Sequence, residues 1–133
     1  MLLMLNHTVP CNAGERVNHE TIKAAIMREA VSQGVSPKLA IGVATVESGL
    51  NPSARGSKGE IGLFQLLPSN IRAGSGKSTS DLIREGIKEL KYWQTHCPST
   101  EDYTFVNCYN QGLRHPKYPK LFPYYRKVMQ AMR

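Results

Sequence analysis

The stretch SPKLAIGVATVESG, residues 36–49, carries the clearest local structural signal in the chain. Ser36 followed by Pro37 favours the start of an α-helix, because serine caps free backbone N–H groups and proline suits the first turn. Gly49 favours its end, because glycine readily adopts the left-handed backbone that closes many helices. We therefore predict a helix over residues 37–48. Almost no residue inside it is polar.

Further helices are predicted on both sides of this one from capping residues and apolar spacing. Residues 49–80 are rich in Gly, Ser, Asn and Pro, and we expect a short strand pair or an irregular lobe at 51–66. The chain is therefore predicted to be one mainly α domain. The other predicted helices run over about residues 19–33 with Asn18 as cap and Gly34 as stop, over 81–96 after Ser80, from a Ser99–Asp102 capping box to about Asn110 with Gly112 as stop, and from Pro123 onward with Tyr125, Val128, Met129 and Met132 as its apolar stripe.

Glu47 is the first candidate for chemistry, because it lies in the last turn of the apolar helix. The helix dipole places partial negative charge there, which disfavours a carboxylate. Apolar neighbours desolvate the same group, and both effects raise its pKa. A carboxyl group with a raised pKa is suited to general acid catalysis near neutral pH. Taken alone, however, Glu47 is better explained as a solvated glutamate at a helix end.

Three short motifs place Glu47 in a larger pattern. They are ESGLNPSA at residues 47–54, GLFQLLP at 62–68 and CYNQG at 108–112. Each is weak alone, but in this order and spacing they resemble the soluble lytic transglycosylase family, whose motifs are Glu-Ser, Gly-Leu-Met-Gln and Ala-Tyr-Asn-Ala-Gly. The resemblance covers about residues 37–130 and implies an α+β lysozyme-like fold. The first 17 residues have no counterpart in it, so we expect the domain to span residues 18–133.

The resemblance implies cleavage of the β-1,4 bond between N-acetylmuramic acid and N-acetylglucosamine in peptidoglycan, with 1,6-anhydro ends as product. Glu47 is implied as the acid that protonates the glycosidic oxygen and then serves as base. One carboxylate suffices because the attacking hydroxyl belongs to the substrate itself. The other matched positions are implied to bind the sugar, to line the cleft or to orient Glu47, and they are Ser48, Ser57, Phe64, Gln65, Tyr109 and Asn110.

Glu60 is the main departure from the family pattern, two places before the Gly of the second motif. In animal-type lysozymes, by resemblance, this segment carries the second catalytic carboxylate. Glu60 therefore leaves a hydrolytic lysozyme open as an alternative, since glycosidases that use water normally need two carboxyl groups. We expect instead that Glu60 points to solvent. A wall-binding module without catalysis is the third alternative.

The net charge of +7 favours polyanionic partners such as the cell wall, nucleic acid or anionic lipid. No basic helix, zinc finger or aromatic RNA-binding motif is present, so nucleic acid is not expected. The run GSGKST at residues 74–79 resembles a phosphate-binding loop. However, Ile71 occupies the position of its first glycine and no buried strand precedes it, which favours a surface loop.

The cysteines and histidines show no metal-ligand spacing, so neither a metal nor a cofactor is expected. Cys11, Cys97 and Cys108 are interpreted first as small buried apolar residues and second as containing a Cys97–Cys108 disulfide. Residues 1–5 are too short for a membrane span and lack the features of a signal peptide. We expect action in the periplasm or at the cell wall, delivered without a recognisable leader. This favours association with a phage or a secretion apparatus.

Overall fold

The structure is a computed structural model that describes residues 13–114 and 116–133, with only the backbone of residues 13–17. The described part of the chain is mainly helical, which confirms the predicted fold class. Three short 3-10 helices, η1 to η3, connect the longer elements. In chain order the elements are α1 (Ala13–Gln33), α2 (Pro37–Ser48), η1 (Pro68–Asn70), α3 (Thr79–His96), η2 (Glu101–Tyr103), α4 (Val106–Gln111), η3 (Pro119–Leu121) and α5 (Pro123–Ala131).

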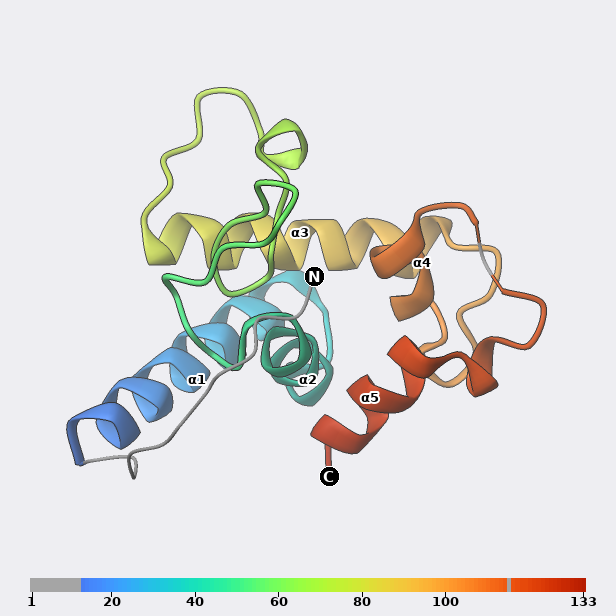
Figure 1. Ribbon diagram of the computed structural model, residues 1–133, viewed down its shortest axis with the longest axis horizontal. Helices are drawn as coiled ribbons and strands as arrows, with labels where there is room; N and C mark the ends of the chain where they lie inside the picture. The colour runs from blue at the N-terminus through green and yellow to red at the C-terminus, as the bar shows by residue number, and fades with distance from the viewer. Residues whose placement is uncertain (1–12, 115) are drawn as a thin grey trace.

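Helix α2 is the centre of the packing. Figure 1 shows it end-on between α1 and α5, and it packs against both of them, while α1 also packs against α3. The bounds of α2 are those predicted from the sequence. The Ser36 hydroxyl accepts a hydrogen bond from the Leu39 N–H at 3.2 Å, and Gly49 closes the helix with φ 62°. Four apolar residues of α2 are fully buried in the core: Leu39, Ala40, Val43 and Ala44.

The segment between α2 and α3 forms the irregular lobe that the sequence predicted. Within the described residues its only strand-like pairings are two isolated antiparallel bridges, Arg55 with Ile61 and Ile61 with Leu66. The lobe is fastened to α3 through Phe64, whose ring is fully buried. A Cβ atom on Gly86 would lie 2.6 Å from Phe64 side-chain atoms, so only glycine allows this approach. The GSGKST run continues the irregular chain and ends at the start of α3.

Two helices begin earlier in the chain than the sequence predicted. Helix α1 begins at Ala13, not at residue 19, and Asn18 lies inside it. Residues 13–18 contain no proline that would stop a helix. Asparagine inside a helix lowers helix stability by roughly 0.7 kcal/mol or less relative to alanine, so α1 continues through Asn18. Helix α3 begins at Thr79 with Ser78 as its cap. Ser78 and Asp81 form a reciprocal capping box, which satisfies two backbone N–H groups better than the predicted start would.

The predicted helix from Ser99 to Asn110 was wrong over its first half. The Ser99 hydroxyl pairs with the Thr104 hydroxyl at 2.7 Å instead of capping a helix. Asp102 and Tyr103 have φ values of 48° and 70°, a left-handed backbone through which an α-helix cannot continue. The carboxylate of Asp102 instead accepts a 2.6 Å hydrogen bond from Lys120. Within the predicted range only the residues of α4 form an α-helix, which ends before Gly112 as predicted, while η2 is a single 3-10 turn.

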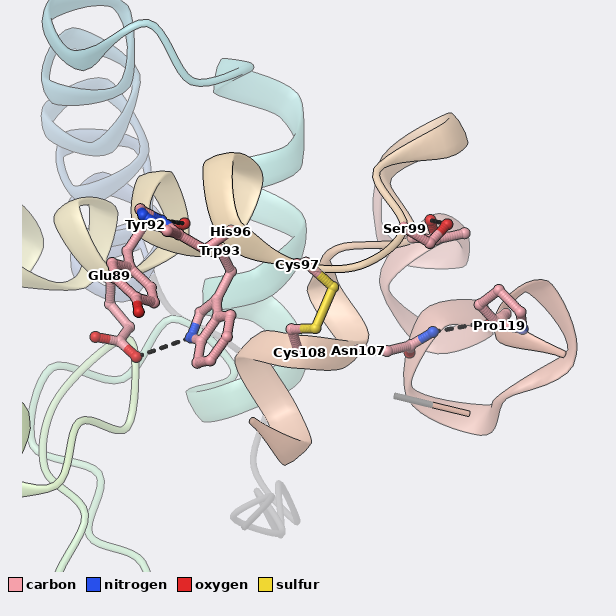
Figure 2. Close-up of a disulfide and its surroundings, with 10 residues drawn as sticks. Glu89, Tyr92, Trp93, His96, Cys97, Ser99, Asn107, Cys108 and Pro119 are labelled. Atoms are coloured by element: carbon pink, nitrogen blue, oxygen red, sulfur yellow. Dashed lines mark hydrogen bonds between the residues drawn. A yellow bond between two sulfur atoms is a disulfide. The ribbon is translucent and has the colours of Figure 1, made fainter. Parts of the chain in front are cut away.

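Cys97 and Cys108 are joined by a disulfide, so the preference for unpaired buried cysteines was wrong. Their Cα atoms lie 6.0 Å apart, a normal separation for a disulfide. Both residues are also buried, as the prediction of small buried apolar residues required. The bond links the end of α3 to α4 (Figure 2). Cys11 lies outside the described residues.

Candidate active site

One cavity gathers most of the residues that the motifs singled out. Its walls come from the end of α2, from the irregular lobe and η1, from α3 and from α4, which are far apart in sequence. No helix among the described residues is long and apolar enough to cross a membrane. The described residues likewise contain no cluster of three or more potential metal-ligating side chains. The residues lining the cavity are Glu47, Glu60, Gln65, Leu66, Leu67, Asn70, Glu89, Tyr109 and Asn110.

Glu47 lies in the last turn of α2 and is only 7% exposed. The hydroxyl of Tyr124, on α5, donates a 2.6 Å hydrogen bond to its Oε2 atom. Burial raises the pKa of Glu47, because water no longer solvates its charged form. The Tyr124 hydrogen bond partly opposes this rise, and the negative charge of Glu60 adds to it. Glu47 therefore combines a raised pKa with an access route through the cavity.

Glu60 does not point to solvent, contrary to expectation. It is 9% exposed and lines the same cavity as Glu47. The turn that carries it folds back, because the N–H of Gly56 donates to the Glu60 carbonyl oxygen at 2.9 Å. The Lys58 N–H also donates to Glu60 Oε1 at 2.9 Å. Burial acts to raise the pKa of Glu60, but hydrogen bonds from the backbone N–H groups of Glu60 and Lys58 help to bring it below the usual value.

Gln65 lies in the cavity wall with a left-handed backbone, φ 49°, which is uncommon for a residue with a side chain. Its side-chain N–H₂ donates to the carbonyl oxygens of Ala54 and Gly62, at 3.1 and 2.9 Å. These bonds hold the amide in one orientation. Its Oε1 atom is buried and has no hydrogen-bond partner among the described residues. An unpaired buried acceptor costs about 1–3 kcal/mol.

Tyr109 and Asn110 reach the cavity from α4. The Tyr109 hydroxyl donates a 2.6 Å hydrogen bond to the Phe64 carbonyl oxygen, which ties α4 to the lobe. Burial raises the pKa of Tyr109 well above its ordinary value, and the negative charges of Glu47 and Glu89 raise it further. The tyrosine therefore stays neutral. Asn110 is exposed and sits at the rim of the cavity.

Three of the residues expected to contact substrate do not lie in the cavity wall. Ser48 is fully buried, and its hydroxyl donates to the Ala44 carbonyl oxygen at 2.9 Å, so it holds the helix end. The Phe64 ring is directed into the core by its packing against Gly86. Ser57 is exposed on the turn of the lobe.

Two functional candidates were not predicted from the sequence. Tyr124 is the hydrogen-bond partner of Glu47, and it lies beside the apolar stripe predicted for the last helix. Glu89 lines the cavity from α3, where its Oε2 accepts a 2.9 Å hydrogen bond from the Trp93 indole N–H. The i, i+4 spacing of Glu89 and the chain's single tryptophan was the available signal for this pair.

Comparison with known proteins bears on the whole domain. The model of the family described as "Transglycosylase SLT domain" matches residues 24–120, well over half of the chain. The match contains Glu47, Glu60, Gln65 and Tyr109, but it ends before Tyr124. Searches of curated proteins and of solved structures return no match.

Proposed function

The chain belongs to the transglycosylase SLT domain family, and on that premise we propose that it is a lytic transglycosylase with Glu47 as general acid and base. The family acts on peptidoglycan, and the proposed bond is the β-1,4 link from N-acetylmuramic acid to N-acetylglucosamine. The observation that carries the proposal is the environment of Glu47. It is a buried carboxyl group with a raised pKa, held by Tyr124, in a cavity with an unpaired Gln65 acceptor.

The proposed reaction needs one proton-transfer group. Protonated Glu47 gives its proton to the glycosidic oxygen, and the bond from that oxygen to C1 of the muramic acid breaks. The resulting carboxylate takes the proton from the sugar's own 6-hydroxyl, whose oxygen closes on C1. Glu47 ends in its starting form and no water is consumed. The nucleophile is part of the substrate, so its effective concentration is high without a second activating residue.

Two neighbours support this cycle. The Tyr124 hydroxyl stabilises the carboxylate of Glu47 after the first proton transfer, because it donates to Oε2. Glu60 has a lowered pKa and is therefore ionised near neutral pH. A negative charge at the cavity wall stabilises the positive charge that develops on the sugar ring. This gives Glu60 an electrostatic role without a covalent step.

A hydrolytic lysozyme is the second candidate, and one observation favours it. Glu60 is ionised and lines the same cavity as Glu47, so a second carboxylate is present on the cavity wall. In that mechanism Glu60 would activate water or attack C1 itself. The two reactions leave different ends on the glycan strand.

Product analysis separates the two candidates. Purified peptidoglycan is digested with the protein, and the soluble fragments are separated and weighed by mass spectrometry. Fragments that end in 1,6-anhydro-muramic acid are lighter by one water than fragments with reducing ends. Anhydro ends are the expected result. Reducing ends would establish the lysozyme reaction, and intact glycan strands would overturn both proposals.

We also propose that the catalytic unit extends beyond the family match to α5, because Tyr124 contacts Glu47 from there. Because the proposed substrate is peptidoglycan, we propose that the protein acts at the cell wall, outside the cytoplasm. The Cys97–Cys108 disulfide supports that location, since disulfides persist in oxidising compartments.

A further inference from the structure

The disulfide joins two elements at the edge of the cavity. Cys97 directly follows α3, and its N–H donates to the Trp93 carbonyl oxygen at 2.9 Å. Cys108 lies in the middle of α4 and immediately precedes Tyr109. Figure 2 shows the bond bridging from the end of α3 to α4, with Trp93 and Glu89 on the same stretch of α3. The disulfide therefore connects the long helix α3 directly to α4, which carries the cavity residues Tyr109 and Asn110.

Helix α4 has little intrinsic stability of its own. It contains six residues, and isolated helices shorter than about 12–15 residues are marginal in water. The segment that leads to it from α3 is irregular, with left-handed backbone at Asp102 and Tyr103. Lys120 pairs with Glu101 and Asp102 of this segment, but these ion pairs are exposed, and such pairs contribute little. The Tyr125 hydroxyl adds one hydrogen bond to the Asp102 carbonyl oxygen, at 3.0 Å. Tertiary contacts and the disulfide therefore determine where α4 lies.

Helix α4 also packs against α3 and α5, and a few specific side-chain contacts add to this packing. Val106 is fully buried, and the Asn107 side-chain N–H₂ donates to the Pro119 carbonyl oxygen at 2.9 Å. The Tyr109 hydroxyl bonds the Phe64 carbonyl oxygen. Glu47 and its partner Tyr124, in contrast, are held by the packing of α2 against α5. Loss of the disulfide would therefore loosen the wall of the cavity before it disturbs the acid.

We infer that the Cys97–Cys108 disulfide positions Tyr109 and Asn110 in the cavity and makes glycan cleavage depend on an oxidising environment. With both thiols reduced, α4 moves away from its place and substrate is no longer held against Glu47. The inference rests on the proposed function for its effect on activity. Its structural half, the release of α4 on reduction, does not depend on what the substrate is.

The redox step is ordinary thiol–disulfide exchange. A small dithiol reductant gives two electrons and two protons, the sulfur–sulfur bond breaks, and the two cysteines become thiols while the reductant closes its own disulfide. The reverse step needs a disulfide oxidant, which takes up the two electrons and two protons and becomes a dithiol. A wall-cleaving enzyme controlled in this way would be inactive in the cytoplasm and active where disulfides form.

The test compares the full chain in its oxidised form with the same chain after treatment with dithiothreitol, with free thiols counted in each. Hydrogen exchange of α4 amides is expected to rise on reduction, while exchange in α2 stays slow. Peptidoglycan cleavage, as kcat/KM, is expected to fall by roughly 10²-fold, since small displacements of positioning groups cost about that much. The high-pH limb of the rate profile should move to lower pH, because α4 no longer helps to bury Glu47 and burial is what raises its pKa.

The double variant Cys97→Ser/Cys108→Ser should behave like the reduced protein and show no response to dithiothreitol. Cys11→Ser is the matched control and should respond as the wild type does. Three free thiols in the oxidised protein, unchanged α4 exchange on reduction, or exchange that rises equally in α2 would each overturn the inference. If the oxidised protein cleaves no glycan, the proposed function fails, and the exchange measurement still decides the role of the disulfide.

Discussion

The hydroxyl of Tyr124 donates a 2.6 Å hydrogen bond to Oε2 of Glu47, across 77 residues of sequence. Glu47 ends α2, and Tyr124 lies in the first turn of α5. The two helices pack closely because Gly42 presents no side chain between them: a Cβ there would lie 2.9 Å from the Met132 side chain. The position and ionisation of the proposed acid are therefore set partly by the last helix of the chain.

Replacing Tyr124 with phenylalanine tests this relationship. The hydrogen bond lowers the pKa of Glu47, so its loss leaves burial less opposed and raises that pKa further. A general acid works in its protonated form, and its rate falls as pH rises through its pKa. Tyr124→Phe should therefore move the high-pH limb of the rate profile to higher pH. Tyr125→Phe, whose hydroxyl bonds the Asp102 carbonyl oxygen instead, is the matched control. An unmoved limb in Tyr124→Phe would contradict the assignment.

Glu47→Gln should abolish peptidoglycan cleavage while the fold persists. Glutamine keeps the shape and can still accept the Tyr124 hydrogen bond, but it has no proton to deliver. Loss of general acid catalysis typically costs about 10²–10⁴ in rate. The measurement is release of soluble fragments from purified walls, with Glu20→Gln, an exposed surface change, as the control. Near wild-type lysis by the Glu47 variant would remove Glu47 from the mechanism.

The same substitution should alter how stability depends on pH. The folded-state pKa of Glu47 is raised, so its contribution to stability is fully present below the unfolded pKa. It is lost as pH rises through the folded pKa, because the buried carboxyl group must then ionise or the chain unfold. Glu47→Gln removes this cost. Urea unfolding should show a gain in stability relative to wild type that grows from acidic to neutral pH, and a gain that shrinks would refute the argument.

Glu60→Gln distinguishes an electrostatic role from a covalent one. In the transglycosylase reaction the variant should keep most of its activity and still produce anhydro ends. Removing the charge also removes one cause that raises the pKa of Glu47, so the high-pH limb should move to lower pH. If Glu60 is instead a nucleophile or base, the loss should approach that of Glu47→Gln. Kinetics and product masses together decide between these outcomes.

Gly86→Ala should destabilise the domain, although alanine normally favours a helix over glycine. The new Cβ would lie within 2.6 Å of Phe64 atoms, and overpacking of this kind costs about 1–3 kcal/mol. The Phe64 carbonyl oxygen receives the Tyr109 hydrogen bond, so activity should fall as well. Thermal unfolding measures the first effect, with exposed Lys88→Ala on the same helix as control. If Gly86→Ala were as stable as the wild type or more stable, the prediction would be contradicted, because the lobe would then shift to make room for the added methyl group.

Much of the architecture followed from local signals. The bounds of α2 were correct because Ser36, Pro37 and Gly49 act on backbone groups a few residues away. The irregular character of 51–66 was correct for the same reason, since glycine, proline and serine disfavour regular structure where they stand. The order of the three motifs was sufficient to indicate the family, which the match over residues 24–120 confirms.

Tertiary packing alone decided how the motif residues are used. The sequence could not show that Phe64 turns into the core while its carbonyl oxygen serves Tyr109, or that Glu60 folds back to the cavity of Glu47. It determined the identity of the acid candidate and the apolar helix that desolvates it. The Tyr124 hydroxyl and the bond between Cys97 and Cys108 depend on which helices meet. Contacts between helices arise from the burial of side chains distant in sequence, and no spacing along the chain records them.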